Sequence, residues 1–548
     1  MTLIWATILG VFVGATGEIV AELTVEYGRD IGYSIYQALV CQEDTRMPMR
    51  EYCRDFVWLL PPSLEEFIPK DHPVRFIAEF VDHLDLGKIG IDWTPSEEGA
   101  SSYDRRMLLA CWLYGFMVRI RSSRKIETAC RENVTFMWLT GMQRPDHSTL
   151  SRFYKKNRKC IRKVLKKTVD LAVEVGLVDF AVQAIDGSKI GSVTVDGQLG
   201  RKKIEELRQK VDEEIAAMER GIDQEGSASQ HEAQRKLPKG LGCKKELRER
   251  IDNALAKLEE LEGNSKKPAE EQKQGKDKQK KKPKVSVADP EAVMMKARHG
   301  NALGHNAQAV VDAKAHIIVA ADVFDSATDY DQLVPMLEET KQNTGRLADK
   351  TVTDAGYHSG ENLEKVADLP TEVIIPDPQE KRKADNPNEW PYHKDNFVYD
   401  SDTDSYRCPE GKKVTFSYKT HRKDEGDKEV RVYRGRKCSG CPAWGEGGCT
   451  KDKKGRTLEI SGHEERIREH RQKMQTEEAR ALVKQRSGIV ELVFGVIKEH
   501  MGVSRFLLRG LENAKAEWQM ACAVYNLRRV WKEIWINQAS PKLCQRAA

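Results

Sequence analysis

The sequence predicts a mixed α/β protein in which a helical N-terminal region is followed by a sheet that two insertions interrupt. Apolar residues recur at helical spacing from Phe56 to Phe180. Short apolar runs rich in β-branched residues begin at Phe180 and resume after Asp289, with a helical pattern between two of them. This order of elements is typical of a central sheet with helices packed against it.

Composition limits the class of protein. The 548 residues leave room for about two to four domains. Apolar residues make up 39% and charged residues 32%, a balance that suits a large core and excludes a membrane protein. Ninety Lys and Arg oppose 85 Asp and Glu, which suits a large enzyme with basic stripes better than a small basic DNA-binding domain. Twelve cysteines are too sparse for a secreted disulfide scaffold, so we expect a reducing, cytoplasmic location.

The N-terminal part divides into two segments. Residues 1–45 are interpreted as an uncertain leader, because the apolar stretch Leu3–Ala15 is too short to span a bilayer and no Lys or Arg precedes it as in a signal peptide. Residues 46–179 are predicted to form a helical N-terminal domain. Helical spacing is clearest in three segments: Val74–Leu86, Arg105–Ile120 and Lys159–Leu177. Asp146 stands where an N-cap belongs, before a short basic helix.

The sheet is expected to combine residues 180–199, 286–376 and 464–535. Its predicted strands are Phe180–Asp186, Asn306–Ala313, Ala315–Phe324, Lys350–Tyr357 and Glu372–Pro376, the second and third paired as a hairpin. A helix is predicted for Asp331–Gly345, with the glycine as its stop. The last hundred residues have helical patterns, and residues 536–548 are expected to be a C-terminal tail.

Two insertions are predicted within this sheet domain. Residues 200–285 begin with two helical segments rich in potential ion pairs, which predict an antiparallel helical hairpin. They end in Lys266–Lys284, whose nine lysines indicate a disordered basic tether. Residues 377–463 are polar, rich in turns and contain four cysteines, and are expected to be β-rich.

Three acids are candidate ligands for a metal. Asp186 and Asp354 end two predicted strands, and Glu491 lies on a predicted helix with Gly495 and Lys498 on the same face. Converging carboxylates repel one another unless divalent cations neutralise them, and oxygen ligands favour Mg²⁺ or Mn²⁺. Two such ions can activate an attacking oxygen and stabilise the leaving oxygen of a phosphodiester. The alternative is that each acid only caps a turn or a helix.

Four cysteines are candidate zinc ligands: Cys408, Cys438, Cys441 and Cys449. A CxxC pair with two flanking cysteines near Gly and Pro turns suits a tetrahedral, structural Zn²⁺ site. One alternative is a set of four unlinked thiols in a loop-rich insertion. Another is a redox pair formed by Cys438 and Cys441, for which no thioredoxin-like strand and helix context is present.

Basic residues in the two runs Arg121–Lys125 and Ser151–Lys167 are candidates for DNA contact. They are Arg121, Arg124, Lys125, Arg152, Lys155 and Lys156. The alternative is a solvated basic face of an ordinary helical bundle. The Lys266–Lys284 tether is interpreted as a linker that can add salt-sensitive affinity for DNA.

Seven blocks of this sequence resemble the DDE transposases of bacterial insertion sequences. The blocks lie at Leu59–Phe76, Ser122–Gly141, Pro145–Phe153, Ala184–Ile190, Asp289–Asp312, Thr353–Tyr357 and from Ile489 to Trp518. The resemblance implies an RNase H-like catalytic domain behind an InsH-type N-terminal domain that binds DNA. It also implies that Asp186, Asp354 and Glu491 are the three acids of the catalytic triad.

The resemblance assigns two further residues to contact with DNA. Lys498 matches the lysine seven positions after the glutamate in a Tyr-Arg-Glu-Lys signature, and Arg486 matches its arginine. The tyrosine of that signature is absent, since the chain has Leu482, Val483, Lys484 and Gln485 before Arg486. The implied reaction cleaves the ends of the element and joins the 3′-OH to target DNA with two Mg²⁺ or Mn²⁺ ions. The implied partners are double-stranded DNA and a second copy of the chain, in a bacterial, nucleoid-associated setting.

Other functions stay open from the sequence. One is a catalytically silent or domesticated DNA-binding protein of transposase origin. A second is a nuclease of the same fold that cuts but does not join DNA. A third is a regulatory zinc protein.

Overall fold

The computed structural model describes residues 63–91, 102–194, 197–226, 239–265, 282–297, 300–379, 390–421, 429–436, 438–445 and 448–536. Contacts divide the chain into two units, Met1–Pro69 and Lys70–Ala548. The first unit contributes a single short 3-10 helix, η1 (Leu64–Phe67), to the described ranges. The predicted leader and the tether up to Lys281 lie outside the described residues.

The N-terminal part of the second unit is helical. Its helices are α4 (Pro73–Asp82), α5 (Leu86–Ile89), α6 (Arg105–Met117), α7 (Ser123–Glu132), α8 (Val134–Leu139), α9 (His147–Asn157), η2 (Arg158–Cys160) and α10 (Ile161–Glu174). α6 forms the centre, because every residue from Leu108 to Met117 is buried. The Trp112 indole N–H donates to the Leu150 carbonyl at 3.2 Å and so fixes α9 against α6. Asp146 caps α9 as predicted, accepting the Thr149 N–H at 3.0 Å.

A mixed sheet follows, and it confirms the predicted α/β class. Its strands are β1 (Val182–Gly191), β2 (Val293–Ala297), β3 (Gly300–Asp312), β4 (Ile318–Phe324), β5 (Lys350–Val352) and β6 (Glu372–Ile374). The strand order is β2-β3-β1-β5-β6, and β4 also pairs with β3. β1 is antiparallel to β3 and parallel to β5, and β5 is parallel to β6. The antiparallel pairing of β3 with β4 confirms the predicted hairpin.

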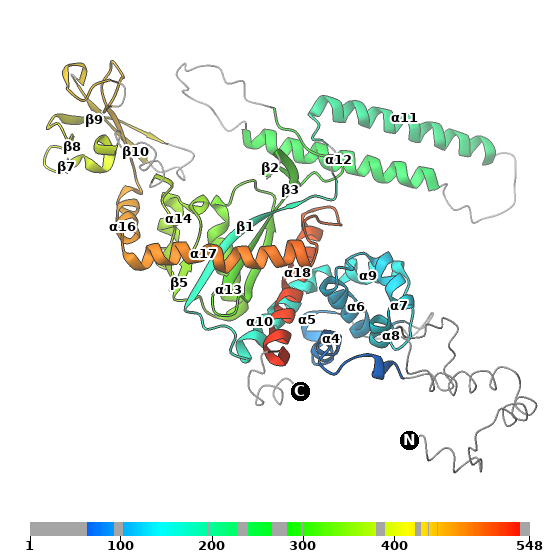
Figure 1. Ribbon diagram of the computed structural model, residues 1–548. Coiled ribbons are helices and arrows are strands. Elements are labelled where there is room, and N and C mark those ends of the chain that lie inside the picture. Colours follow the sequence, from blue (N-terminus) through cyan, green and yellow to red (C-terminus); the bar gives the residue numbers. More distant parts are fainter. Residues whose placement is uncertain are drawn as a thin grey trace, which may run out of the picture. The chain divides into compact units, whose positions relative to one another are not determined.

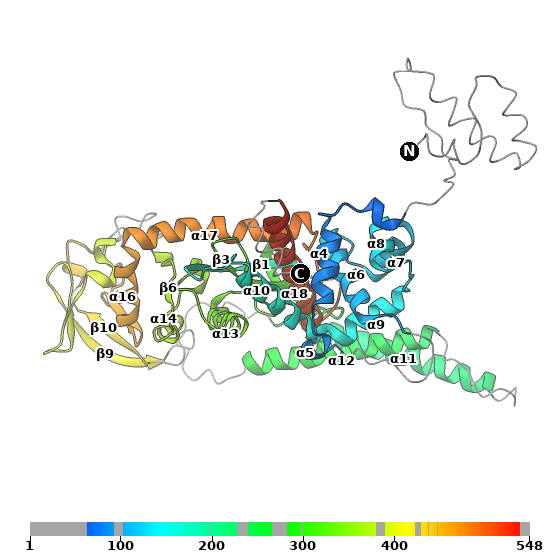
Figure 2. The ribbon, with the colours of Figure 1, turned by 90° about the horizontal axis from the view of Figure 1, so that it is seen from below.

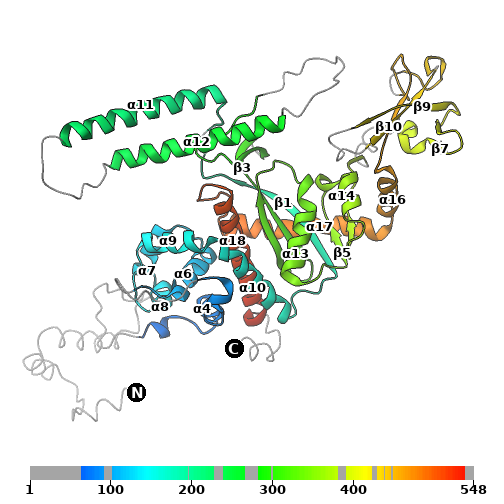
Figure 3. The ribbon, with the colours of Figure 1, turned by 180° about the vertical axis from the view of Figure 1, so that it is seen from behind.

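Helices cover both faces of this sheet. α13 (Leu333–Thr344) lies on one face and α17 (Glu477–Gly495) crosses the other (Figures 1 and 3). The remaining elements are α14 (Gly360–Lys365), α16 (Glu464–Met474), the π-helical segment η9 (Val496–His500), α18 (Leu511–Trp531) and η10 (Lys532–Ile536). The Trp518 indole of α18 donates to the Gln308 carbonyl at 2.9 Å and stacks on Phe494, which ties α17 and α18 to β3.

The first insertion is a pair of antiparallel helices, α11 (Arg201–Gly226) and α12 (Lys239–Ser265), which lie side by side in Figures 1 and 2. Arg201 at the start of α11 pairs with Glu262 near the end of α12 at 3.0 Å. The buried side chains between the helices are Ile204, Val211, Ile215, Ile251, Ala254, Leu255 and Leu258. Leu199 and Val285 form an antiparallel bridge where the insertion leaves and re-enters the domain.

The cysteine-containing segment forms a second, antiparallel sheet. Its strands, in spatial order, are β11 (Thr457–Ser461), β10 (Glu429–Gly435), β9 (Lys413–His421), β8 (Ser405–Arg407) and β7 (Val398–Asp400). A small core supports it, formed by Phe397, Tyr406, Val414, Tyr433, Leu458 and Ile460. Across the described ranges, every helix is too short or too polar to cross a bilayer.

Candidate functional site

The register of β1 and β5 brings two of the predicted acids together. The parallel pairing ends where Ala184 is opposite Val352. Asp186 and Asp354 each follow two residues later, so they lie at the same level beyond the last paired residues. The prediction that the first strand ends at Asp186 is wrong, because β1 continues to Gly191 along β3. Asp186 still lies beyond the part of β1 that β5 pairs with, so that edge of β1 is free of β5.

Asp186 is partly buried and ion-paired. Arg486 on α17 donates to its carboxylate at 2.8 Å, and both side chains are 17% exposed. Burial raises the pKa of Asp186 to about 6, with Arg486 opposing the rise and Asp354 adding to it. The site therefore holds negative charge that its own arginine only partly neutralises.

Asp354 shapes the turn in which it lies. Its carboxylate accepts the Gly356 N–H at 2.8 Å and caps η4 (Ala355–Tyr357). Burial raises the pKa of Asp354, the Gly356 N–H and Arg486 oppose the rise, and Asp329 adds to it. The predicted tight Ala-Gly-Tyr turn is therefore present, and its carboxylate lies in the field of a second acid.

Glu491 lies on α17 and is exposed, without a hydrogen bond or ion pair among the described residues. It shares its side of the helix with Lys498, seven residues on. Burial lowers the pKa of Lys498 and the charge of Asp186 opposes that shift, so Lys498 lies within reach of the Asp186 field. Arg486 is the α17 residue that contacts Asp186, and the structure shows no direct contact between Glu491 and Asp186.

Sequence reasoning missed Asp329, which precedes η3 (Tyr330–Gln332). Its carboxylate accepts the Asn306 amide at 2.8 Å and the Gln308 amide at 2.6 Å. Gln308 in turn accepts a hydrogen bond from the Tyr357 hydroxyl. Tyr357 is the last residue of η4, the turn that Asp354 caps. In the sequence, a single acid in a turn before a helix looks like an ordinary helix cap. The spacing of residues around Asp329 therefore did not mark it as a site residue.

The donor set suits a divalent cation, although the side chains do not converge on one point. No group of three or more His, Cys, Asp or Glu side chains stands close enough to hold an ion within the described ranges. Carboxylate oxygens at the end of a parallel strand pair are nevertheless the ligand type that Mg²⁺ and Mn²⁺ prefer. Asp186 and Asp354 therefore suit such an ion in chemistry, and in this structure Arg486 pairs with the Asp186 carboxylate.

Five of the six predicted basic residues in the helical part are exposed: Arg124, Lys125, Arg152, Lys155 and Lys156. Arg124 and Arg152 line one cavity of about 410 Å³ at the start of α7 and α9. The Glu127 carboxylate holds these two helix starts together, because it accepts the His147 backbone N–H at 3.1 Å. The cavity therefore combines two cations with the positive ends of two helices.

Arg121 departs from the prediction of a DNA contact. It donates to Glu517 at 2.7 Å and to the Gly502 carbonyl at 2.6 Å, and its side chain is 10% exposed. Burial raises the pKa of Glu517 to about 7, with Arg121 opposing the rise. This arginine joins the helical part to α18, and its guanidinium is not at the surface.

We expect Arg121→Ala to lower the free energy of unfolding by about 3 kcal/mol at pH 8, because Glu517 would remain buried without its partner. The folded pKa of Glu517 lies above its ordinary value of 4.5, so the protonated form is favoured in the folded protein. Stability from this group is greatest at low pH and is lost as pH rises through about 7. The destabilisation should therefore be smaller at pH 5 than at pH 8 in urea unfolding.

Arg124→Ala is the matched control for this experiment. Arg124 is exposed three residues away, so its loss should change the free energy of unfolding by less than about 0.5 kcal/mol. Equal effects of the two substitutions would contradict the buried role of Arg121.

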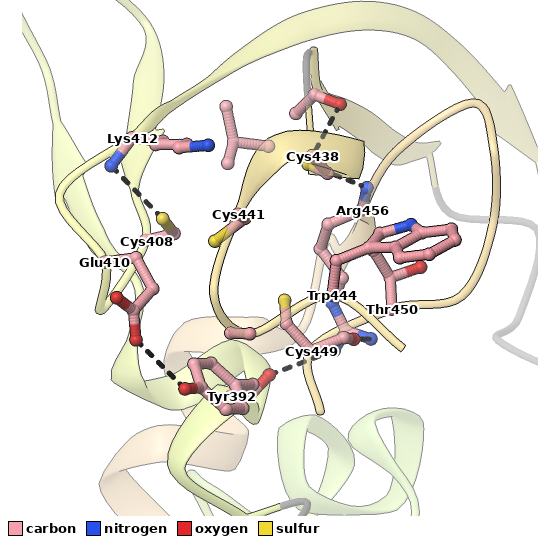
Figure 4. A pocket seen from close by; sticks show the side chains of 13 residues that line it. Tyr392, Cys408, Glu410, Lys412, Cys438, Cys441, Trp444, Cys449, Thr450 and Arg456 are labelled. Carbon is pink, nitrogen blue, oxygen red and sulfur yellow. Dashed lines mark hydrogen bonds between the residues drawn. The ribbon is translucent and has the colours of Figure 1, made fainter. Parts of the chain in front are cut away.

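The four predicted zinc ligands line one cavity of about 20 Å³, shown in Figure 4. Cys408 accepts the Lys412 N–H at 3.2 Å, and Cys438 accepts the Arg456 N–H at 3.5 Å. Burial and the three other thiols raise the pKa of Cys449, while Arg456 opposes the rise. The cavity is large enough for about one water or ion and too small for an organic ligand.

Comparison with family profiles gives two matches to this chain. A family profile described as Transposase DDE domain matches residues 407–531, and one described as Transposase domain (DUF772) matches residues 62–156. No curated protein and no solved structure matches the chain. The two profiles, together with the mixed α/β fold, support a transposase. The particular assignment that they support is a DDE transposase of an insertion element.

The matched ranges cover only part of the site. Glu491, Lys498 and the four cysteines lie inside the DDE match, and the basic residues of α7 and α9 lie inside the other. Asp186 and Asp354 lie outside both ranges. Proteins of the DDE family generally use a divalent metal, and the family implies DNA binding.

Proposed function

We propose that this chain cleaves the DNA ends of its insertion element and joins the exposed 3′-OH to target DNA. The observation that carries the proposal is the register of β1 and β5, which sets Asp186 and Asp354 at the same level just beyond the last paired residues of the two strands. Glu491 is proposed as the third acid because it lies on α17, the helix whose Arg486 pairs with Asp186. The antiparallel and parallel halves of this sheet meet at β1, which supports the RNase H-like class that the resemblance implies.

Asp186, Asp354 and Glu491 would hold two divalent cations, Mg²⁺ or Mn²⁺. When bound, such ions activate the attacking oxygen and stabilise the leaving oxygen of a phosphodiester. Arg486 and Lys498 stand before and after Glu491 on the α17 segment, and they place positive charge beside the acids for the phosphate backbone. Because both ends of an element are joined to the target in one event, we propose that the active form is a homodimer on DNA.

A cleavage and joining assay on the element's own ends tests the function, with Mg²⁺ and with EDTA. Mg²⁺-dependent nicking followed by joining is the expected result. Nicking without joining would favour a nuclease of the same fold. Binding without any cleavage would favour the alternative of a catalytically silent DNA-binding protein.

The α7 and α9 cavity is proposed as a contact for DNA phosphates. Replacing Arg124 and Arg152 together with Ala should weaken binding to the element's ends. It should also reduce the slope of log K against log salt by nearly two, at about 0.9 for each lost phosphate contact. Filter binding or fluorescence anisotropy at several salt concentrations measures this slope.

The charge-matched control is the double substitution of Lys202 and Lys203 with Ala. Both lysines are exposed on α11, in the helical insertion. The control should leave the slope within error of the wild type. An identical loss in both double variants would mean that total charge, and not this cavity, determines binding.

We also propose a structural Zn²⁺ held by Cys408, Cys438, Cys441 and Cys449. Four sulfur atoms around one ion-sized cavity are the donor set of such sites. Backbone N–H groups that point at Cys408 and Cys438 favour the thiolate form that a metal requires. The ion would link the β8–β9 turn to the loop between β10 and β11.

A further inference from the structure

Two glycines beside the proposed metal ligands share one neighbour. An added Cβ at Gly187 would stand 2.4 Å from an Asp329 carboxylate oxygen and 2.3 Å from the Gln308 amide. An added Cβ at Gly356 would stand 3.0 Å from an Asp354 oxygen and 3.5 Å from an Asp329 oxygen. The carboxylates of Asp354 and Asp329 therefore face the same space beside Gly356.

A chain of hydrogen bonds connects Asp329 to the Asp354 turn. Asp329 accepts from the Gln308 amide at 2.6 Å, and Gln308 accepts from the buried Tyr357 hydroxyl. Tyr357 ends the turn that Asp354 caps. The Asn362 amide fixes the same turn from the other side, because it donates to the Tyr357 carbonyl at 2.8 Å and to the Tyr330 carbonyl at 2.7 Å.

The same chain also reaches the strand that carries Asp186. Gln308 is opposite Gly187 in the pairing of β1 with β3, and Gly187 follows Asp186 directly. Asp329 thus packs against both acid-bearing segments, because its carboxylate oxygens face Gly187 of β1 and Gly356 of the Asp354 turn. Its charge lies next to Asp354 without an ion pair among the described residues.

We infer that Asp329 is a positioning residue of the proposed active site, which sets the Asp354 turn against β1 and adds negative charge for a divalent cation. The inference rests on the proposed function and extends it by a fourth acid. Asn306 and Gln308 both donate to the Oδ1 oxygen of Asp329, which fixes the carboxylate, and its Oδ2 oxygen faces Gly356 in the Asp354 turn. Outer partners of this kind typically change metal affinity about 10–100-fold.

Calorimetric titration of the full-length protein with Mn²⁺ alone measures the affinity for the ion and tests this inference. Asp329→Asn keeps the size and one acceptor oxygen but removes the charge, so it should weaken Mn²⁺ affinity by about tenfold or more. Asp331→Asn is the matched control, because Asp331 is an exposed acid two residues away and should bind Mn²⁺ as the wild type does. Asp186→Asn tests the proposed metal site itself, because this variant should lose Mn²⁺ affinity.

The outcomes separate the inference from the function on which it rests. Equal affinity of wild type and Asp329→Asn, with affinity lost in Asp186→Asn, would overturn the role of Asp329 alone. Equal affinity of wild type and Asp186→Asn, or no binding by the wild type, would overturn the proposed metal site and this inference with it.

A second variant guards against misfolding of Asp329→Asn, which a thermal melt would reveal. Tyr357→Phe keeps the buried ring and removes only the donor to Gln308. It should weaken Mn²⁺ affinity in the same direction. Unchanged affinity in a folded Tyr357→Phe variant would show that the hydrogen-bonded chain does not position Asp354.

Discussion

Replacing Glu491 with Gln, or Asp186 or Asp354 with Asn, is expected to lower the rate of Mg²⁺-dependent DNA cleavage by more than about 100-fold. Loss of a partner outside the ligand shell already costs about 10–100-fold in metal affinity or activity, and loss of a ligand should cost more. Each substitution keeps the shape of the side chain and removes the charge that holds the ion. Binding to the element's ends should remain largely intact, because the proposed contacts of α7 and α9 are unchanged.

Glu477→Gln is the matched control for this series. Glu477 is an exposed acid in the first turn of the same helix, fourteen residues before Glu491 and about 20 Å away along the helix axis. It should cleave at the wild-type rate. Full activity in any one of the three site variants would remove that residue from the proposed metal site, and loss of DNA binding with cleavage would indicate damage to the fold.

Local patterns predicted most elements of this fold. The helix α13 follows from its helical pattern and from Gly345, which adopts a left-handed backbone conformation as the stop. The β3–β4 hairpin follows from two consecutive short apolar runs. The two helices of the first insertion follow from their charge pattern, and the structure pairs them as predicted. In each case the pattern that predicts a helix or strand lies within the residues of that helix or strand.

Features that depend on distant partners were not predictable in this way. β1 runs past Asp186 because β3, more than a hundred residues later, pairs with it as far as Gly191. Arg121 lies in a basic run that resembles a surface, but its partner is Glu517, 396 residues away. The position of Asp329 beside the site is visible only in the structure, where its carboxylate packs against Gly187 and Gly356. Spacing within one segment cannot reveal any of these contacts.

The part of the site closest to prediction is the pair of aspartates. Both were identified as acids after short apolar strands, and the register sets them level. The third acid depended on helical spacing with Lys498, and the helix α17 is present as predicted. The sequence could not show the ion-pair partner of Asp186. That partner is Arg486, on the same helix as Glu491, at 2.8 Å.

Purified protein is expected to contain about one zinc per chain, and Cys441→Ser should lose it. The second sheet has a small core, so a metal that links its turns would contribute much of its folding free energy, about 10 kcal/mol in isolated zinc-finger peptides. Zinc loss should therefore melt β7–β11 at a lower temperature than the rest of the chain. Metal analysis after purification without chelators, with a thermal melt followed by circular dichroism, measures both effects.

Cys243→Ser separates a zinc site from a general effect of losing a thiol. Cys243 is exposed on α12 and does not line the cavity, so this variant should keep its zinc and its melting profile. A wild-type protein free of zinc would overturn the proposal. The number of reactive thiols per chain, counted before and after mild oxidation of such a protein, would then separate the two alternatives. A fall of two would favour the redox pair, whereas an unchanged number would favour four unlinked thiols.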